Sequence, residues 1–164
     1  MSPALYMTKI VLPTVEEYLA DRGNPRRAII ACVMAYHVRD YMEKAGACTK
    51  QDVDRAIKGL YPLSWEVVEG VCNGSKHVRN TQRGNFKFTI GDQRRIPAFT
   101  AGVSFLGQAR LGVPGLVVGH QGRSHYIDNC LCAVLGAFGR AFPELSGIDL
   151  EGYGQKVPGW PSAP

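Results

Sequence analysis

Apolar residues recur at three- and four-residue steps through the first third of the chain. The longest such stretch begins at Asn24 and Pro25, a favourable N-cap and first-turn pair, and runs to Gly46. The residues at this spacing are Ile29, Ile30, Val33, Met34, His37, Val38 and Tyr41. This period predicts one long amphipathic helix, preceded by a shorter helix over about Thr14 to Asp21.

Two further helices are predicted before residue 77. Thr49 with Asp52 three residues later resembles a capping box and opens a helix that reaches about Leu60. Pro62 and Ser64 then start another helix. The residues of this helix that are expected to face a core are Trp65, Val68, Val71 and Cys72.

From Phe86 the hydrophobic period changes to two, because Phe86, Phe88 and Ile90 alternate with polar residues. Residues 103–106 and 116–118 are further strand candidates, and Gly-His-Gln-Gly at 119–122 is typical of a hairpin turn. Asp128 is expected to cap a final helix. Its apolar face would consist of Leu131, Val134, Leu135 and Phe138.

These elements predict an α+β fold with a helical N-terminal half, a small antiparallel sheet or hairpin, a final C-terminal helix and an irregular tail. We expect one domain over residues 1–145 and a Gly- and Pro-rich tail over 146–164. The chain beyond Phe142 is predicted not to form a packed core. Trp160 in this tail is a candidate anchor on a partner or on the domain's own surface.

Composition supports a single-core domain. The chain has 164 residues, of which 45% are hydrophobic, and it contains no apolar run near the roughly 20 residues of a membrane helix. Met1 to Lys9 lack the features of a secretory signal, so we expect a cytoplasmic, soluble protein. Five cysteines without a CxxC pair favour buried free thiols over a disulfide or metal role.

Charge is distributed unevenly along the chain. Residues 1–75 contain nine basic and nine acidic residues, residues 76–127 contain eight basic and one acidic, and residues 128–164 contain two basic and four acidic, which gives 0, +7 and −2. The eight cations are Lys76, Arg79, Arg83, Lys87, Arg94, Arg95, Arg110 and Arg123. A polyanion such as RNA would be attracted to this middle segment, although a solvated basic surface without a ligand is an equal alternative.

The segment Cys72-Asn73-Gly74-Ser75-Lys76-His77 concentrates polar chemistry just after the Trp65 helix. Asn73 and His77 are four residues apart, so they share a helix face with Glu66 and Gly70 if the helix continues. Gly74 weakens the helix, so the cluster is expected in its final turns or in its cap.

The order of these elements resembles a group of uncharacterised bacterial proteins with an Asn-Gly-Ser/Thr-Lys-His signature. More distantly, it is similar to the HEPN superfamily of helical RNases in toxin and phage-defence systems. The resemblance implies an RNA-binding and RNA-cleaving homodimer without a metal cofactor, in which Asn73 and His77 match the polar residue and the His of the HEPN motif. The HEPN Arg does not carry over: its positions are Cys72, Val71 and Gly70. Lys76 or Arg79 could supply a cation instead.

Metal-free RNA cleavage requires a base, an acid and a cation near the phosphate. We therefore predict a catalytic set of His77, Lys76, Asn73, His37 and Asp40. His37 is expected on the core side of the long helix, near the Trp65 helix, with Asp40 orienting it. The nucleic-acid-binding set would be Lys76, Arg79, Arg83, Lys87, Arg94 and Arg95. Alternatively, His37 is a core histidine, and Asn73, Ser75 and His77 form a helix C-cap.

His120 and His125 flank the predicted turn and could approach each other, but a metal site with two histidines and only Asp128 nearby is disfavoured. No metal or other cofactor is therefore predicted. The remaining alternative is a non-catalytic structural or interaction protein, phage-derived in origin, that binds partners through its basic surface and C-terminal tail.

Overall fold

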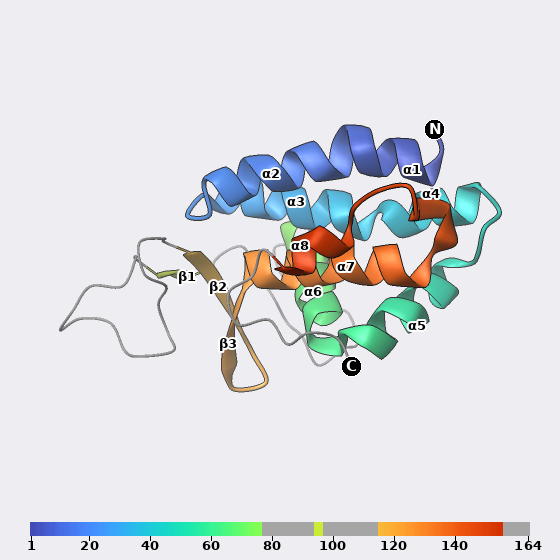
Figure 1. Cartoon of the computed structure of the whole chain (residues 1–164). Coiled ribbons are helices and arrows are strands. Elements are labelled where there is room, and N and C mark those ends of the chain that lie inside the picture. Colours follow the sequence, from blue (N-terminus) through green and yellow to red (C-terminus); the bar gives the residue numbers. More distant parts are fainter. Residues whose placement is uncertain (77–93, 97–114, 156–164) are drawn as a thin grey trace.

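The computed structural model describes residues 1–76, 94–96 and 115–155, and it confirms the α+β fold (Figure 1). The helical elements are α1 (Pro3–Tyr6), the π-helical η1 (Met7–Val11), α2 (Leu12–Ala20), α3 (Pro25–Tyr36), α4 (Val38–Lys44), α5 (Lys50–Leu60), α6 (Pro62–Lys76), α7 (Ile127–Ala141), the 3₁₀ turn η3 (Pro143–Leu145) and α8 (Glu151–Gln155). The strands are β1 (Arg94–Ile96), β2 (Gly115–His120) and β3 (Arg123–Tyr126). None of the described helices is long and apolar enough to cross a membrane.

Local capping signals set two helix starts as predicted. The Asn24 side chain accepts a hydrogen bond from the Arg27 backbone N–H and begins α3. Thr49 and Asp52 form a complete capping box at the start of α5. These caps succeed because both partners lie within three residues of each other.

The predicted long helix is in fact two helices. His37 lies between α3 and α4 with φ −76° and ψ −4°, outside the regular helix. Its carbonyl accepts from the Asp40 N–H, a three-residue step that tightens the chain. The side chains of His37 and Asp40 also bond to each other, which favours this local bend over a continuous helix.

The first helix starts earlier than predicted. Helical structure runs from Pro3 through η1 to Ala20, and the Ser2 side chain caps its start by accepting from the Leu5 N–H. Pro13 near the start of α2 has no N–H to donate, and its ring is ill-suited to an ordinary helix interior. The π turn immediately before it widens the helix at this point.

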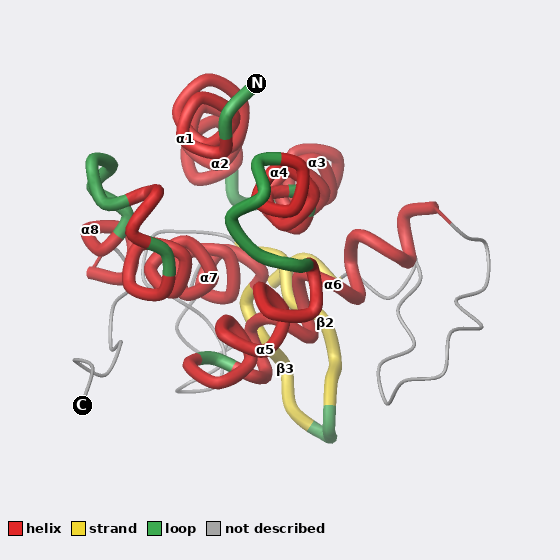
Figure 2. Tube along the Cα trace, turned by 90° about the vertical axis from the view of Figure 1, so that its right-hand side faces the viewer, coloured by secondary structure: helices red, strands yellow, loops and turns green. Residues whose placement is uncertain are grey.

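Helix α7 lies at the centre of the molecule, between the α1–α2 and α3–α4 layer and α5, with α8 against its outer side (Figures 1 and 2). Eleven of its residues are buried, including the predicted Leu131, Val134, Leu135 and Phe138. Trp65 of α6 packs edge-on against Phe138, with ring centroids 6.1 Å apart. All five cysteines are free, and four of them are buried, as predicted.

The described strands form one antiparallel sheet in the order β1-β2-β3. The turn between β2 and β3 is at Gln121 and Gly122, both with positive φ, as a tight two-residue hairpin requires. The predicted strand at 116–118 and the hairpin are confirmed. The predicted strands at 86–90 and 103–106 lie outside the described residues.

Asp128 does not cap α7, contrary to the prediction. The N-cap position is Tyr126, which makes no side-chain capping bond. Asp128 lies in the first turn, 2% exposed, and forms an ion pair of 3.1 Å with Arg22 just beyond α2. This ion pair joins the end of α2 to the start of α7, so the carboxylate serves tertiary packing instead of a cap.

The prediction that the chain beyond Phe142 does not pack is wrong for residues 143–155. Leu145 and Leu150 are fully buried, and the hydroxyl of the buried Tyr153 donates to Glu16 Oε1 at 2.6 Å. Glycine content misled the prediction, because the apolar residues between the glycines dock on α7. Residues 156–164, which include Trp160, lie outside the described residues.

The docking of residues 146–155 depends on Gly139 of α7. A Cβ at Gly139 would lie 2.9 Å from Leu150 Cβ, whereas a Cβ at the exposed Gly59 of α5 would meet nothing within 4 Å. We therefore expect Gly139→Ala to lower the free energy of unfolding by about 1 to 2 kcal/mol, since overpacking outweighs the gain in helix propensity. Gly59→Ala should instead raise it by up to about 1 kcal/mol. Urea unfolding of both variants tests this pair, and equal effects would contradict it.

Candidate functional site

The polar cluster begins inside α6. The helix continues through Lys76, so residues 73–76 occupy its last turn. Of the two predicted positions for the cluster, the final turns of the helix or its cap, the structure has the first for these residues. Ser75 Oγ donates to the Cys72 carbonyl at 2.7 Å, within the helix itself. At Ser75, this bond agrees with the alternative in which the polar cluster caps the C-terminal end of the helix. His77 lies outside the described residues.

The predicted nucleic-acid-binding residues are only partly placed. Lys76 is the last residue of α6, and Arg94 and Arg95 belong to β1, opposite Val117 and Leu116 of β2. Arg79, Arg83 and Lys87 lie outside the described residues. Of these six residues, the structure therefore describes Lys76 at the end of α6 and Arg94 and Arg95 in β1.

His37 and Asp40 come together as predicted. His37 Nδ1 bonds to Asp40 Oδ2, and the His37 side chain is 33% exposed. The expectation that His37 faces the core is wrong. Its neighbour Tyr36 takes the core position, 5.3 Å from the Trp65 ring, because the bend at residue 37 turns the imidazole outward.

Lys50, which the residue pattern did not predict, completes this group. Its Nζ lies 2.7 Å from Asp40 Oδ1 and 3.5 Å from Glu43 Oε2. Burial acts to raise the pKa of the Asp40 carboxyl, but hydrogen bonds and charge from Lys50 and His37 outweigh it and hold that pKa below its usual value. Asp40 is therefore a carboxylate at neutral pH, held on both oxygens.

A second polar network links α3 and α4 to α5 and α6. Arg39 Nη1 lies 2.9 and 2.8 Å from the two carboxylate oxygens of Asp54, and its guanidinium stacks over the Tyr36 ring at 3.8 Å. The Tyr36 hydroxyl donates to Glu69 Oε1 at 3.0 Å, and Lys58 pairs with Glu69 at 3.5 Å. Burial, followed by the charge of Glu69, raises the pKa of Tyr36, so the phenol keeps its proton.

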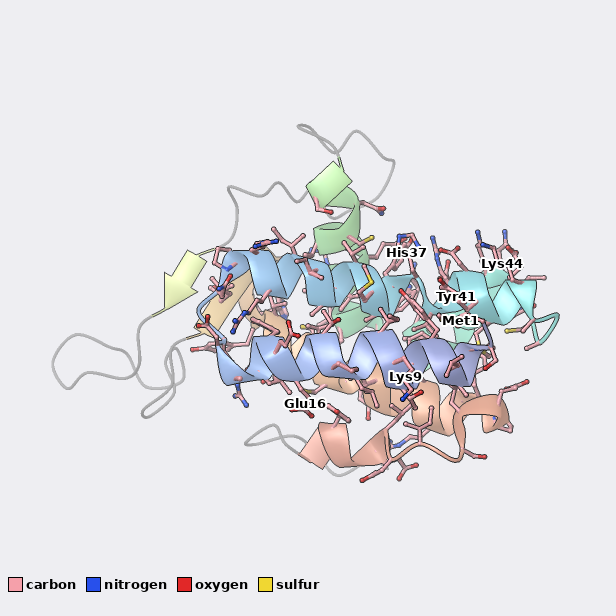
Figure 3. All side chains as sticks on the ribbon, turned by 90° about the horizontal axis from the view of Figure 1, so that it is seen from above. Met1, Lys9, Glu16, His37, Tyr41 and Lys44 are labelled. Carbon is pink, nitrogen blue, oxygen red and sulfur yellow. The ribbon has the colours of Figure 1, made fainter. Side chains whose placement is uncertain are left out.

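His37 and the end of α6 lie on the same side of the molecule. Figure 3 shows His37 on the edge of the α3–α4 layer toward which the C-terminal end of α6 extends. The hydrogen bond between Tyr36, next to His37, and Glu69, one turn before Asn73, agrees with this arrangement. The candidate imidazole and the start of the basic segment thus share one face.

The two histidines of the hairpin have structural partners. His120 Nε2 lies 2.7 Å from Glu66 Oε2 of α6, and the His120 side chain is only 2% exposed. His125 Nε2 lies 3.3 Å from the His120 carbonyl oxygen, and the two rings are 6.2 Å apart. The described part of the chain contains no group of three or more His, Cys, Asp or Glu residues suited to a metal.

Most cations in the helical part of the chain form ion pairs with carboxylates of the same chain. Of the nine basic residues in 1–75, six form ion pairs with described carboxylates at 2.7 to 3.5 Å. They are Arg22, Arg27, Arg39, Lys50, Arg55 and Lys58. The net charge of residues 1–75 is zero, and most of their cations lie next to a carboxylate. The net positive charge of the protein therefore comes from residues 76–127.

Comparison with known proteins adds no relative. No protein-family model matches the chain, and neither a curated protein nor a solved structure is significantly similar to it. The functional argument therefore rests on the residues described above.

The Glu66–His120 pair should be a measurable link between α6 and the hairpin. Glu66→Leu leaves the buried His120 nitrogen without its carboxylate, and we expect a loss of about 1 to 3 kcal/mol in the free energy of unfolding. Glu66→Gln keeps a hydrogen-bond acceptor, so its loss in the free energy of unfolding should be less than half that of Glu66→Leu. Urea unfolding of the two variants, with His120→Phe and the Glu66→Leu/His120→Phe double variant, gives the coupling energy. Additive losses would show that the pair does not couple the two elements.

Proposed function

We propose that this protein binds RNA through the basic segment that begins at the end of α6, and that it cleaves the bound RNA without a metal. The observation that carries the proposal is the segregation of charge. Residues 76–127 have a net charge of +7, and residues 1–75 have a net charge of 0. Binding to the phosphate backbone depends on such a concentration of cations.

The ion pairs of the helical body support this assignment. A cation that faces its own carboxylate contributes little to the field that a polyanion experiences, because the opposite charge lies within a few ångströms. The cations of Lys76, Arg94 and Arg95 belong to a segment with Asp92 as its one acidic residue. The phosphate-binding surface is therefore proposed on this segment, with the helical body as its support.

The proposal of RNA cleavage, as distinct from binding alone, rests on the imidazole chemistry near this surface. His37 with its ionised Asp40 lies on the same side of the molecule as the end of α6. His77, Lys76 and Asn73 complete the proposed catalytic set. RNA is the proposed substrate because its 2′-hydroxyl is a built-in nucleophile that a base can activate.

The resemblance to HEPN proteins is retained only in part. The positions at which a HEPN Arg would stand, Gly70, Val71 and Cys72, are all buried. An arginine there would place a charge inside the core. We therefore propose a HEPN-like protein of a toxin or phage-defence system that works as a homodimer and takes its cation from Lys76 or Arg79.

Binding can be tested on the two arginines of β1. We expect Arg94→Gln/Arg95→Gln to weaken binding of a single-stranded RNA oligonucleotide by about tenfold or more, and to reduce the slope of log K against log salt by about 1 to 2. The matched control is Lys9→Gln/Arg26→Gln, which removes two exposed cations from the neutral body. Fluorescence anisotropy between 50 and 300 mM salt, with a chelator present, gives both quantities.

Two outcomes would contradict the proposal. Equal losses in the two double variants would mean that binding follows net charge and not the basic segment. Absence of binding by the wild-type protein at low salt would remove the proposed function and favour the alternative of a non-catalytic interaction protein. Circular dichroism of each variant confirms that the fold is retained.

A further inference from the structure

We infer that Tyr41 is a stacking site for an unpaired base of the bound RNA, and that Lys44 contacts a phosphate next to that base. The inference rests on the proposed function and adds a base contact on the helical body to the phosphate contacts of the basic segment. It is carried by the surroundings of one ring. Tyr41 stacks on Tyr6, with ring centroids 3.9 Å apart and an interplanar angle of 16°, and the Lys44 ammonium lies over the Tyr41 ring, 5.9 Å from its centroid.

Tyr6 holds the Tyr41 ring in place from below. Tyr6 is 4% exposed, and its hydroxyl donates to the Met34 carbonyl at 3.2 Å. Burial, followed by the neighbouring Tyr41 and Asp40 groups, raises the pKa of Tyr6 to about 12, so this phenol keeps its proton at neutral pH. Tyr41 itself is half-buried at the edge of the core. A base that stacks on Tyr41 therefore meets a ring that is already ordered, which lowers the entropy cost of binding.

The face of Tyr41 that Lys44 overlies has space for a base. The Tyr6 ring is too close to Tyr41 to leave room for an ammonium between them, so Lys44 lies over the opposite face. A closed contact is seen elsewhere, where the Arg39 guanidinium lies 3.8 Å from the Tyr36 centroid. Lys44 is exposed and near the limit of about 6 Å for a cation–π contact. A stacked base lies about 3.5 to 4 Å from the ring below it, so a small movement of the lysine side chain admits one.

Lys44 also has a charge that a phosphate can use. Among the described residues, no carboxylate forms an ion pair with it. The two acidic residues of α4, Asp40 and Glu43, both pair with Lys50, at 2.7 and 3.5 Å from its Nζ. Lys44 therefore differs from most cations of residues 1–75, and its ammonium can approach the phosphate of a nucleotide whose base covers Tyr41.

The stacking site adjoins the start of the basic segment. Besides burial and the groups of α4, the Cys72 thiol of α6 contributes to the raised pKa of Tyr6, so Tyr6 lies near α6 one turn before Lys76. Figure 3 shows Tyr41 and His37 in the same part of the helical layer. The bases of a duplex are already stacked on each other, so the ligand that fits both features is a single strand.

The stacking contact can be tested with the full chain and two fluorescent 2′-O-methyl RNA oligonucleotides, which have no free 2′-hydroxyl and stay intact. One carries all its bases, and the other has abasic central positions. We expect the wild-type protein to bind the abasic probe about tenfold more weakly. Tyr41→Leu should lose about tenfold in affinity for the complete probe and bind the abasic probe as the wild type does. Tyr41→Phe keeps the ring and should match the wild type with both probes.

The phosphate contact of Lys44 is tested by the salt dependence of the same binding. Lys44→Gln should reduce the slope of log K against log salt by about 0.7, the value for one phosphate of a single strand. Tyr41→Leu should leave this slope unchanged, because it removes no charge. The matched control is Arg26→Gln, which removes an exposed cation near the start of α3 and should change neither the affinity nor the slope.

The outcomes separate this inference from the proposed function. Equal wild-type affinity for the two probes, or unchanged affinity in Tyr41→Leu, would overturn the stacking site and leave phosphate binding intact. Equal slopes in Lys44→Gln and Arg26→Gln would overturn the contact of Lys44. Absence of wild-type binding to both probes would overturn the proposed function and this inference together. Circular dichroism identifies a variant that loses its fold, and Tyr41→Met, which keeps an apolar side chain against Tyr6, replaces Tyr41→Leu in that case.

Discussion

The structure depends on the burial of α7 on almost all sides. A helix that is apolar all round is stable in water only when other elements cover each of its faces. Here α3, α5, α6, α8 and β2 all pack against it. The segment that leads into α8 approaches α7 closely, because Gly139 faces Leu150 with no space for a Cβ. The outer helices therefore have fixed positions, and their outward faces are where polar chemistry is placed.

Ion pairs and hydrogen bonds connect those outer faces. Arg39 with Asp54 joins α4 to α5, and Tyr36 with Glu69 joins α3 to α6. The Arg39–Asp54 pair is partly buried, with side chains 19% and 26% exposed. The ion pairs of the helical body also have an electrostatic consequence, because each one places opposite charges next to each other. The net positive charge of the chain is concentrated in residues 76–127, and this concentration is the ground on which a polyanion is proposed as the ligand.

Local signals predicted much of this fold, and long-range contacts account for what was missed. The caps at Asn24 and Thr49 were correct because each needs only residues three positions away. The same spacing made the pairing of His37 with Asp40 predictable. Lys50 was missed because its approach depends on the turn between α4 and α5. The link between Glu66 and His120, 54 residues apart, was likewise invisible to periodicity.

The break at His37 shows why a helical period alone could not place the candidate imidazole. The hydrophobic spacing through residue 41 favours one helix and would direct His37 inward. The side chains of His37 and Asp40 bond to each other, and Lys50 then holds the carboxylate from α5. An uninterrupted helix would keep a polar ring in the core, at a cost that the hydrogen bond to Asp40 would have to offset there. The bend avoids that cost by exposing the ring and placing Tyr36 in the core instead. The feature that interrupts the helix is therefore also the feature that makes the imidazole accessible.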